Sequence, residues 1–161
     1  MGRRRIAMDL DLSRQCPSER WPARTVRPSD AEDLAILLYA SFRSTVDDEG
    51  ETFADARAEI ERTLNGGYGR FLPDASFVIE QGEFLASACL VSWFEPHDAP
   101  LVVFSMTRPE AQRRGMARDL LRRSTNALLD AGYRRLTLIV TVGNTAAERL
   151  YASLGFTPIA G

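Results

Sequence analysis

The sequence predicts a single α/β (α+β) domain, because segments with the two-residue period of strands alternate with segments of helical period. Apolar and polar residues alternate over 6–12, whereas the apolar residues of 116–131 recur three and four positions apart. The length of 161 residues fits one domain. We expect residues 1–22 to form an N-terminal extension with a candidate strand at 6–12, and residues 23–161 to form the functional domain.

The first half of the chain is expected to form two strands followed by two helices. Prolines interrupt the pattern after the first strand and end the second, since proline donates no backbone hydrogen bond. Ser29 or Asp30 can cap the first helix, and Asn-Gly-Gly at 65–67 ends the second. The expected bounds are 6–12 and 23–27 for the strands and about 30–43 and 53–64 for the helices, with an acidic loop at 45–52.

The second half is expected to add a β-hairpin, a further strand and a strand between two helices. Gly82-Glu83 separates two β-forming runs, which is typical of a hairpin turn. Gly132 and Gly155 follow the two amphipathic segments, where glycine commonly ends a helix. The expected strands are 76–81, 84–94, 101–107 and 136–142, and the expected helices are 115–132 and 145–154, with extended chain at 156–159.

Composition excludes several kinds of chemistry. All 20 basic residues are Arg, so the chain has no Lys for a Schiff base or for a Walker-type phosphate loop. A single His97 cannot build a multi-His metal site, and Cys16 and Cys89 lie too far apart for zinc-finger spacing, so no metal is expected. No apolar run reaches the roughly 18 residues of a membrane span. We therefore expect a cytoplasmic protein that does not bind membranes.

Charge is unevenly distributed along the chain. Residues 31–61 carry nine acidic residues and two Arg, whereas residues 108–135 carry eight Arg and three acidic residues. Two interpretations are open: solvated helix faces of opposite sign, or a site that accepts a cationic substrate on one side and a polyanionic ligand on the other. The net charge of −2 and the lack of a basic stripe with interleaved aromatic residues argue against nucleic-acid binding.

Residues 112–117 (Gln-Arg-Arg-Gly-Met-Ala) lie where a strand is followed by an amphipathic helix. Backbone N–H groups at the positive end of a helix can bind phosphate or pyrophosphate. The segment fits neither the Gly-x-Gly-x-x-Gly dinucleotide motif nor Walker A. A glycine before a helix is also ordinary turn chemistry, so this motif needs a second one.

The second motif is Asn144 at a strand exit, Tyr151 two helical turns later and Gly155-Phe156 at the helix end. The two motifs together resemble the GCN5-related N-acetyltransferase (GNAT) superfamily, which transfers an acyl group from coenzyme A to an amine. Residues 112–117 are similar to its Gln/Arg-x-x-Gly-x-Gly/Ala loop, and residues 144–156 to its Asn-x-x-Ala-x-x-x-Tyr-x-x-x-Gly-Phe segment. The resemblance in element order covers about residues 23–160.

This resemblance implies a mixed, mostly antiparallel central sheet with two splayed parallel strands, here 101–107 and 136–142, and about four helices. It implies acetyl-CoA (coenzyme A) as co-substrate and a small-molecule or protein amine as acceptor, in a monomer or homodimer. The residues it assigns to coenzyme A are Phe104, Ser105, Met106, Gln112, Arg113, Arg114, Gly115, Met116, Ala117 and Asn144. A backbone N–H near Met106 would polarise the thioester carbonyl, while Asn144 can also cap the last helix.

By the same resemblance, Tyr151 protonates or hydrogen-bonds the departing thiolate. An ordinary phenol of pKa about 10 is neutral at pH 7, and a thiol of pKa about 8.5 can accept its proton. The alternative is a tyrosine packed on a core helix. Many family members place a carboxylate base on the strand here at 101–107, or on the one before it, and 101–107 contains no acidic residue.

Glu95 and His97, at a strand exit, are the candidate bases, with solvated loop residues as the alternative. Deprotonating an alkylammonium at pH 7 costs about 4.6 kcal/mol, but an α-amine costs only about 1 kcal/mol. A missing base therefore favours an amine of low pKa or deprotonation through a water chain. The acidic loop, including Asp47, Asp48 and Glu49, is expected to attract a cationic amine.

Only five residues follow Phe156, where a family member normally has two strands. We expect residues 6–12 to occupy the vacant place beside 136–142; a partner chain, a truncated edge or an unpaired tail are the alternatives. Two other functions remain open: a non-catalytic acyl-CoA-binding sensor or regulatory module, and an unrelated nucleotide-binding fold that uses the Gly115 loop.

Overall fold

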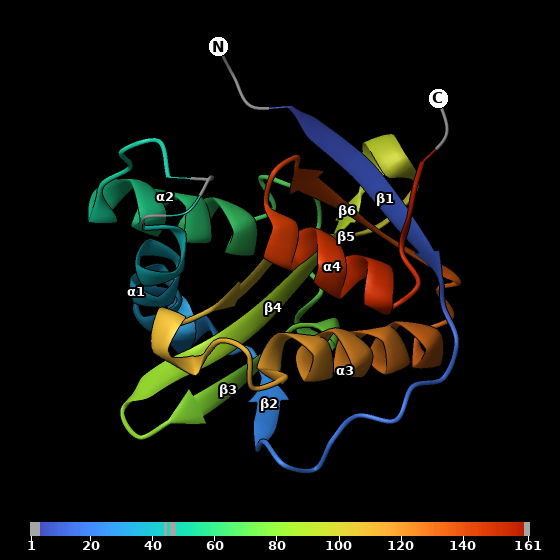
Figure 1. Ribbon diagram of the computed structural model, residues 1–161, viewed down its shortest axis with the longest axis horizontal. Coiled ribbons are helices and arrows are strands. Elements are labelled where there is room, and N and C mark those ends of the chain that lie inside the picture. The colour runs from blue at the N-terminus through green and yellow to red at the C-terminus, as the bar shows by residue number, and fades with distance from the viewer. Residues whose placement is uncertain (1–3, 44, 46–47, 160–161) are drawn as a thin grey trace.

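A seven-stranded sheet forms the frame of the protein in a computed structural model that describes residues 4–43, 45 and 48–159. The strands lie in the order β2-β3-β4-β5-β6-β1-β7, and every neighbouring pair is antiparallel except β5 and β6 (Figure 1). The predicted mixed sheet with one parallel pair is thus confirmed. The strands are β1 Arg5–Asp11, β2 Ala23–Thr25, β3 Phe77–Gln81, β4 Phe84–Phe94, β5 Ala99–Thr107, β6 Arg135–Thr141 and β7 Thr157–Pro158.

The α-helices of the described chain lie close to their predicted positions. α2 begins as a capping box, in which Thr52 accepts the N–H of Asp55 at 3.1 Å and Asp55 accepts the N–H of Thr52 at 2.8 Å. A short 3₁₀ turn precedes α1, so Asp30 does not cap that helix with its side chain. The helices are α1 Ala31–Phe42, α2 Phe53–Leu64, α3 Met116–Asp130 and α4 Thr145–Ser153.

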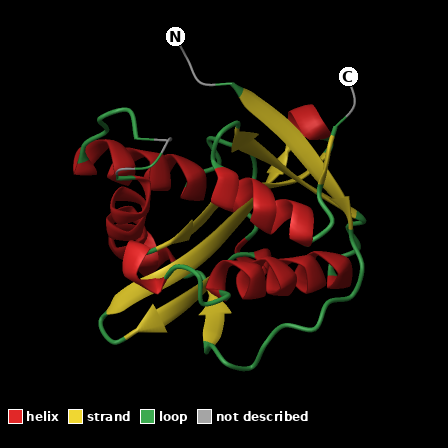
Figure 2. Cartoon of the chain, viewed as in Figure 1, coloured by secondary structure: helices red, strands yellow, loops and turns green. Residues whose placement is uncertain are grey.

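The helices cover the two faces of the sheet and enclose two apolar clusters. α1 and α2 bury Leu34 and Ile60 against one face, together with Leu90 of β4. The next residue, Val91, points to the opposite face and belongs to the cluster that contains Leu120 of α3. Figure 2 shows α3 and α4 on the near side of the sheet. Both faces of β4 are therefore covered, and it pairs with β3 on one side and β5 on the other.

β1 fills the place in the sheet that the sequence predicted for it. It pairs with β6 along its whole length, from Arg5 opposite Thr141 to Asp11 opposite Arg135, and it pairs with β7 on its other side. Met8 is buried between these neighbours with 6% exposure. The N-terminal segment is therefore an interior strand of the sheet rather than an unpaired tail.

The chain continues from β1 across the outer surface of α3 to β2 (Figure 1); we call residues 13–22 the strap. Gln15 donates its backbone N–H to Asn126 Oδ1 at 2.8 Å, and Asn126 Nδ2 donates back to the carbonyl of Gln15 at 3.0 Å. Arg14 forms an ion pair with Asp130 at 2.6 Å. These contacts tie the strap to the C-terminal part of α3.

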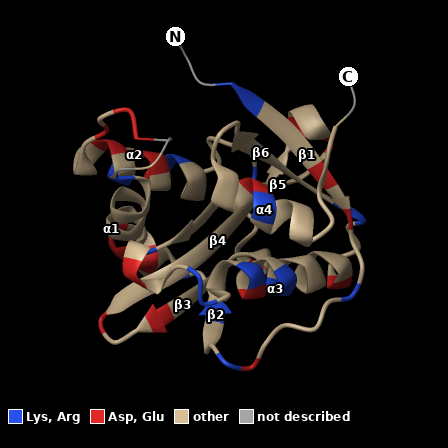
Figure 3. Ribbon diagram, viewed as in Figure 1, with Lys and Arg blue, Asp and Glu red and all other residues tan. Residues whose placement is uncertain are grey.

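Charge is segregated between the elements, as Figure 3 shows. Acidic residues gather on the connection between α1 and α2 and on α2 itself, whereas arginines gather on α3. Among the described residues, no helix has both the length and the apolar character needed to span a bilayer.

Candidate active site

The parallel strands β5 and β6 separate after a very short contact. Only Leu101 opposite Thr137 and Val102 opposite Leu138 pair within the described chain. The register between β4 and β5 shifts at the same point, because Leu90 lies opposite Phe104 and Val91 opposite Val102. Val103 is thus the extra residue of a β-bulge. Beyond it, no described strand pairs with the edge of β5 that faces β6, so this edge can accept an extended ligand.

A cavity of about 840 Å³ opens where the two strands separate. Phe104 and Ser105 of β5 line one wall, and Asn144 and Tyr151 line another. Four of the predicted site residues, which are up to 47 positions apart in the sequence, thus meet at one cavity. Its size is within the range of about 300–1,000 Å³ that is typical of small-molecule sites.

Tyr151 lies on α4 with 9% exposure and lines this cavity. Its ring packs edge-on against Phe156, with 5.8 Å between the ring centroids. Asn144 Oδ1 accepts the N–H of Ala147 at 3.3 Å, so its predicted role as the cap of α4 is confirmed. Asn144 also lines the cavity, so it can cap α4 and still lie in reach of a ligand there.

The start of α3 has the geometry of an anion-binding turn. Gly115, the residue before the helix, has a φ of 87°, and Arg113 has a φ of 67°. α2 and α4 are capped by side chains, but in the described chain no side chain caps α3. The N–H groups of its first turn are therefore oriented toward the loop and available to an anion.

The remaining residues predicted to bind coenzyme A lie outside the 840 Å³ cavity. Gln112 Nε2 donates to the carbonyl of Thr107 at 3.3 Å, which ties the loop to the end of β5. Met106 and Met116 are buried at 3% and 1% exposure, so they can offer only backbone atoms to a ligand. Ala117 follows in the first turn of α3.

Glu95 and His97 do not line the cavity. Glu95 is exposed and accepts the indole N–H of Trp93 at 2.9 Å. Thr137 donates its hydroxyl to the carbonyl of Pro100 at 3.0 Å, so the ring of His97 donates Nδ1–H to Thr137 Oγ1 at 2.8 Å. Burial, and secondly the charge of Arg135, lower the pKa of His97.

The acidic residues of the cavity come from α2 and from the loop before it. Asp47 lies outside the described residues. Tyr68 donates its hydroxyl to Glu59 Oε2, and Arg62 donates to Glu59 Oε1 at 2.8 Å. Burial, and secondly the hydrogen bond to Glu59, raise the pKa of Tyr68. The described acidic residues that line the cavity are Asp48, Glu49, Glu51, Asp55 and Glu59.

The cavity residues that sequence reasoning did not assign to the site include Arg5, Glu59 and Tyr68. Arg5 reaches it because β1 lies beside β6, and the alternation at 6–12 was the available signal for that position. The Glu59–Tyr68 contact bridges the Asn-Gly-Gly turn, and no sequence pattern indicates such a pairing. Among the described residues, no group of three or more His, Cys, Asp or Glu side chains could hold a metal ion.

A family model described as the acetyltransferase (GNAT) family matches residues 31–156, which include both sequence motifs and all the helices. The chain belongs to the GNAT acetyltransferase family. Acyl-CoA-dependent N-acetyl transfer is the general activity of this family. Among curated proteins, none matches the sequence.

Solved structures of acetyltransferases share the fold. A GCN5-related N-acetyltransferase from Sphaerobacter thermophilus has a TM-score of 0.71 at 20% identity, over 96% of this chain and 48% of that one. The ribosomal-protein-S18-alanine N-acetyltransferase from Escherichia coli has a TM-score of 0.68 at 20% identity, over 86% and 79%. PaiA N-acetyltransferase from Thermoplasma acidophilum, in complex with coenzyme A, has a TM-score of 0.66 at 16% identity, over 84% and 89%. The present chain thus spans about half the length of the Sphaerobacter protein.

Proposed function

We propose that the protein transfers an acetyl group from acetyl-CoA to an amine by direct attack in a ternary complex, and that residues 23–161, with β1 completing the sheet, form the acyltransferase domain. The observation that carries this proposal is the cavity at the separation of β5 and β6. It brings the open edge of β5, the hydroxyl-bearing Tyr151 and a wall of carboxylates to one place.

The open edge of β5 supports a role in holding the thioester. The pantetheine arm of acetyl-CoA would extend along the backbone near Phe104 to Met106, with its pyrophosphate at the uncapped start of α3. Backbone N–H groups beside the bulge at Val103 are fixed by the sheet, so they can stabilise the negative charge that develops on the carbonyl oxygen.

Tyr151 supports the departure of coenzyme A. The amine nitrogen forms a bond to the carbonyl carbon, the carbon–sulfur bond breaks, and the phenolic hydroxyl gives its proton to the sulfur. The nitrogen that attacked loses a proton, which returns to the tyrosinate through solvent. Because the amine attacks the thioester directly, no covalent acyl-enzyme is needed. The position of Tyr151 at 9% exposure keeps its hydroxyl in a partly dehydrated site, where such a hydrogen bond is strengthened.

The acidic wall supports a positively charged acceptor. Glu51 accepts the backbone N–H of Glu49, Asp55 accepts that of Thr52, and each of these carboxylates retains acceptor capacity for a ligand. Of the arginines that line the cavity, Arg43 and Arg62 donate to Tyr39 and Glu59. Five described carboxylates line the cavity against three arginines, Arg5, Arg43 and Arg62, so it presents net negative charge to an ammonium group.

Neither Glu95 nor His97 lines the cavity, so in the proposed reaction neither contacts the acceptor directly. An acceptor whose amine has a pKa near neutrality needs little help to lose its proton, about 1 kcal/mol at pH 7. Such an amine, carried by a molecule with further positive charge, suits both the acidic wall and the absence of a carboxylate on β5.

Release of free thiol from acetyl-CoA, measured over a panel of amines, tests the reaction. Tyr151→Phe should lower kcat by about 10²–10⁴-fold with unchanged affinity for acetyl-CoA, because only proton transfer is lost. Tyr133→Phe, at a tyrosine stacked on Trp93 away from the cavity, is the matched control and should leave kcat unchanged. Binding of acetyl-CoA without turnover of any amine would favour the non-catalytic module instead.

The acidic wall is tested by the double substitution Glu49→Gln and Glu51→Gln. We expect the KM of a cationic acceptor to rise several-fold while the KM of acetyl-CoA stays constant. Glu83→Gln, on the β3–β4 turn, is the control for loss of an exposed carboxylate outside the cavity. An unchanged acceptor KM in the double variant would contradict a role for this wall in binding the acceptor.

A further inference from the structure

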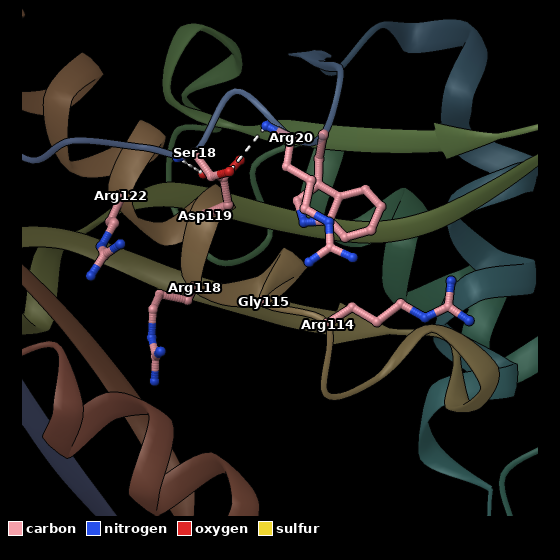
Figure 4. Close-up of a pocket in the computed structure, with 8 residues that line it drawn as sticks. Ser18, Arg20, Arg114, Gly115, Arg118, Asp119 and Arg122 are labelled. Atoms are coloured by element: carbon pink, nitrogen blue, oxygen red, sulfur yellow. Dashed lines mark hydrogen bonds between the residues drawn. The ribbon is translucent and has the colours of Figure 1, made fainter.

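A second, smaller cavity of about 170 Å³ lies between the strap and the start of α3 (Figure 4). α3 contributes Arg118 and Arg122, the loop before it contributes Arg114, and the strap contributes Arg20. In Figure 4, Arg20 extends from the strap toward the beginning of α3. Four arginines from three segments therefore line one small space.

The strap holds its part of this cavity in a fixed position. Asp119, at 2% exposure, accepts the backbone N–H of Ser18, and Arg123 bridges the two by donating to Asp119 at 3.1 Å and to the carbonyl of Ser18 at 2.9 Å. Ser18 Oγ then accepts the N–H of Arg20 at 3.0 Å. The Arg20 guanidinium lies 4.6 Å from the centre of the Trp21 ring, a cation–π contact that orients it.

In the described part of the chain, the four arginines have no carboxylate partner. Seven other arginines of the described chain form ion pairs with carboxylates, but none of these four does. Asp119, the carboxylate on the cavity wall, is already paired with Arg123. In addition, Arg122 Nε is buried and has no acceptor among the described residues. Like charges held together in this way favour an anion that neutralises them.

The size and place of the cavity indicate which anion. A space of about 170 Å³ is too small for a whole nucleotide but sufficient for one ionised group. Gly115 lines this cavity and also belongs to the turn that precedes α3, so the cavity adjoins the proposed pyrophosphate position. Coenzyme A carries a phosphomonoester on the ribose that follows its pyrophosphate. Arginine binds such a group by paired, charge-assisted hydrogen bonds.

We propose that the strap and α3 together bind the 3′-phosphate of coenzyme A, with Arg20 and Arg122 as donors from opposite sides of the cavity. The inference rests on the proposed function and adds a specificity site to it. A segment that lies outside the residues matched by the family model thereby takes part in recognising the co-substrate.

Isothermal titration with coenzyme A and with 3′-dephospho-coenzyme A tests this site, because the two ligands differ only in the phosphomonoester. The unmodified chain should bind coenzyme A at least about tenfold more tightly, the effect expected of one hydrogen bond to a charged group. In Arg20→Gln and in Arg122→Gln the preference should fall to about threefold or less. Arg134→Gln, at an exposed arginine beyond α3, removes the same charge elsewhere and should retain the full preference.

Each other outcome would overturn the inference in a distinguishable way. Equal affinity of the unmodified chain for both ligands would refute the 3′-phosphate site but leave the proposed function intact. A preference that persists in both glutamine variants would also refute it. Failure of both ligands to bind would refute the proposed function itself. If inorganic phosphate competed with coenzyme A as well as adenosine 3′,5′-bisphosphate does, the cavity would be a site for free phosphate.

Discussion

At the scale of single residues, the turn before α3 depends on a backbone conformation that glycine adopts without strain. Gly115 has a φ of 87°, and a Cβ added there would meet no atom within 4 Å, so the restriction is conformational rather than steric. We expect Gly115→Ala to cost about 1–2 kcal/mol of stability and to weaken coenzyme A binding, because the first-turn N–H groups would shift. Urea unfolding and titration with coenzyme A measure the two effects.

Gly132, at the other end of the same helix, provides the control. Its φ is 93° and its surroundings are equally open, so Gly132→Ala should cost a similar amount of stability. It should leave coenzyme A binding unchanged because it lies far from the turn. Equal loss of affinity in both variants would mean that the effect comes from helix stability rather than from the turn.

His97 makes a prediction about pH at the same scale. It is the single histidine of the sequence, so no other side chain has an ordinary pKa near 6.5. Its pKa is lowered in the folded protein, so the unfolded chain binds more protons as pH falls through 6.5. The free energy of unfolding should therefore decrease as the pH falls from about 7 to the lowered pKa of His97 in the folded protein.

The variant His97→Gln, followed by urea unfolding across this range, separates that contribution from the titration of carboxylates at lower pH. We expect a flatter profile over this range in the variant. A profile identical to that of the unmodified chain would show that burial and the charge of Arg135 do not hold the ring in its neutral form.

At the scale of elements, β1 is as much a part of the sheet as the strands that follow it. Met8 belongs to the same apolar cluster as Leu136 and Phe156 and is 6% exposed. We expect Met8→Ala to lower the free energy of unfolding by about 2–5 kcal/mol, the cost of a cavity in a packed core. Asp11→Ala, at the exposed end of β1, should change it by no more than about 0.5 kcal/mol. A loss below about 1 kcal/mol for Met8→Ala would indicate that β1 frays independently of the sheet.

Local pattern was sufficient to predict β1, the four α-helices of the described chain and the turns that precede α3 and α4, since periodicity and glycine placement are properties of short segments. Local pattern was insufficient to predict the bulge at Val103. The bulge arises from the register between β4 and β5, and the sequence of neither strand indicates it. The positions of Glu95 and His97 were also beyond local pattern, because the contact of His97 with Thr137 joins residues 40 positions apart. The strap's course depends in the same way on Asp119, more than a hundred residues away from Ser18.

At the scale of the whole molecule, opposite charges gather in two different places. The acidic wall lines the large cavity and the arginines of α3 line the small one (Figure 3), so in the proposed reaction each would attract one substrate. We expect an increase in NaCl from about 50 to 300 mM to raise both the Kd of coenzyme A and the KM of a cationic acceptor several-fold. Initial-rate and titration experiments at each salt concentration measure this, with a neutral osmolyte as control. A Kd for coenzyme A that does not depend on salt would contradict a binding site built from arginines.

The position of β1 between β6 and β7 has a consequence for the order in which the protein folds. Ile6 pairs with Val140, so the strand synthesised first must wait for one synthesised more than a hundred residues later. At about 5–20 residues per second, this interval is on the order of ten seconds during translation. Residues 5–11 therefore leave the ribosome as an unpaired segment with an apolar face. β1 can pair with β6, one of the two strands that form the opening, only after β6 has been synthesised. The nascent chain is thus most exposed to aggregation or chaperone binding at its N-terminal strand, until β6 emerges.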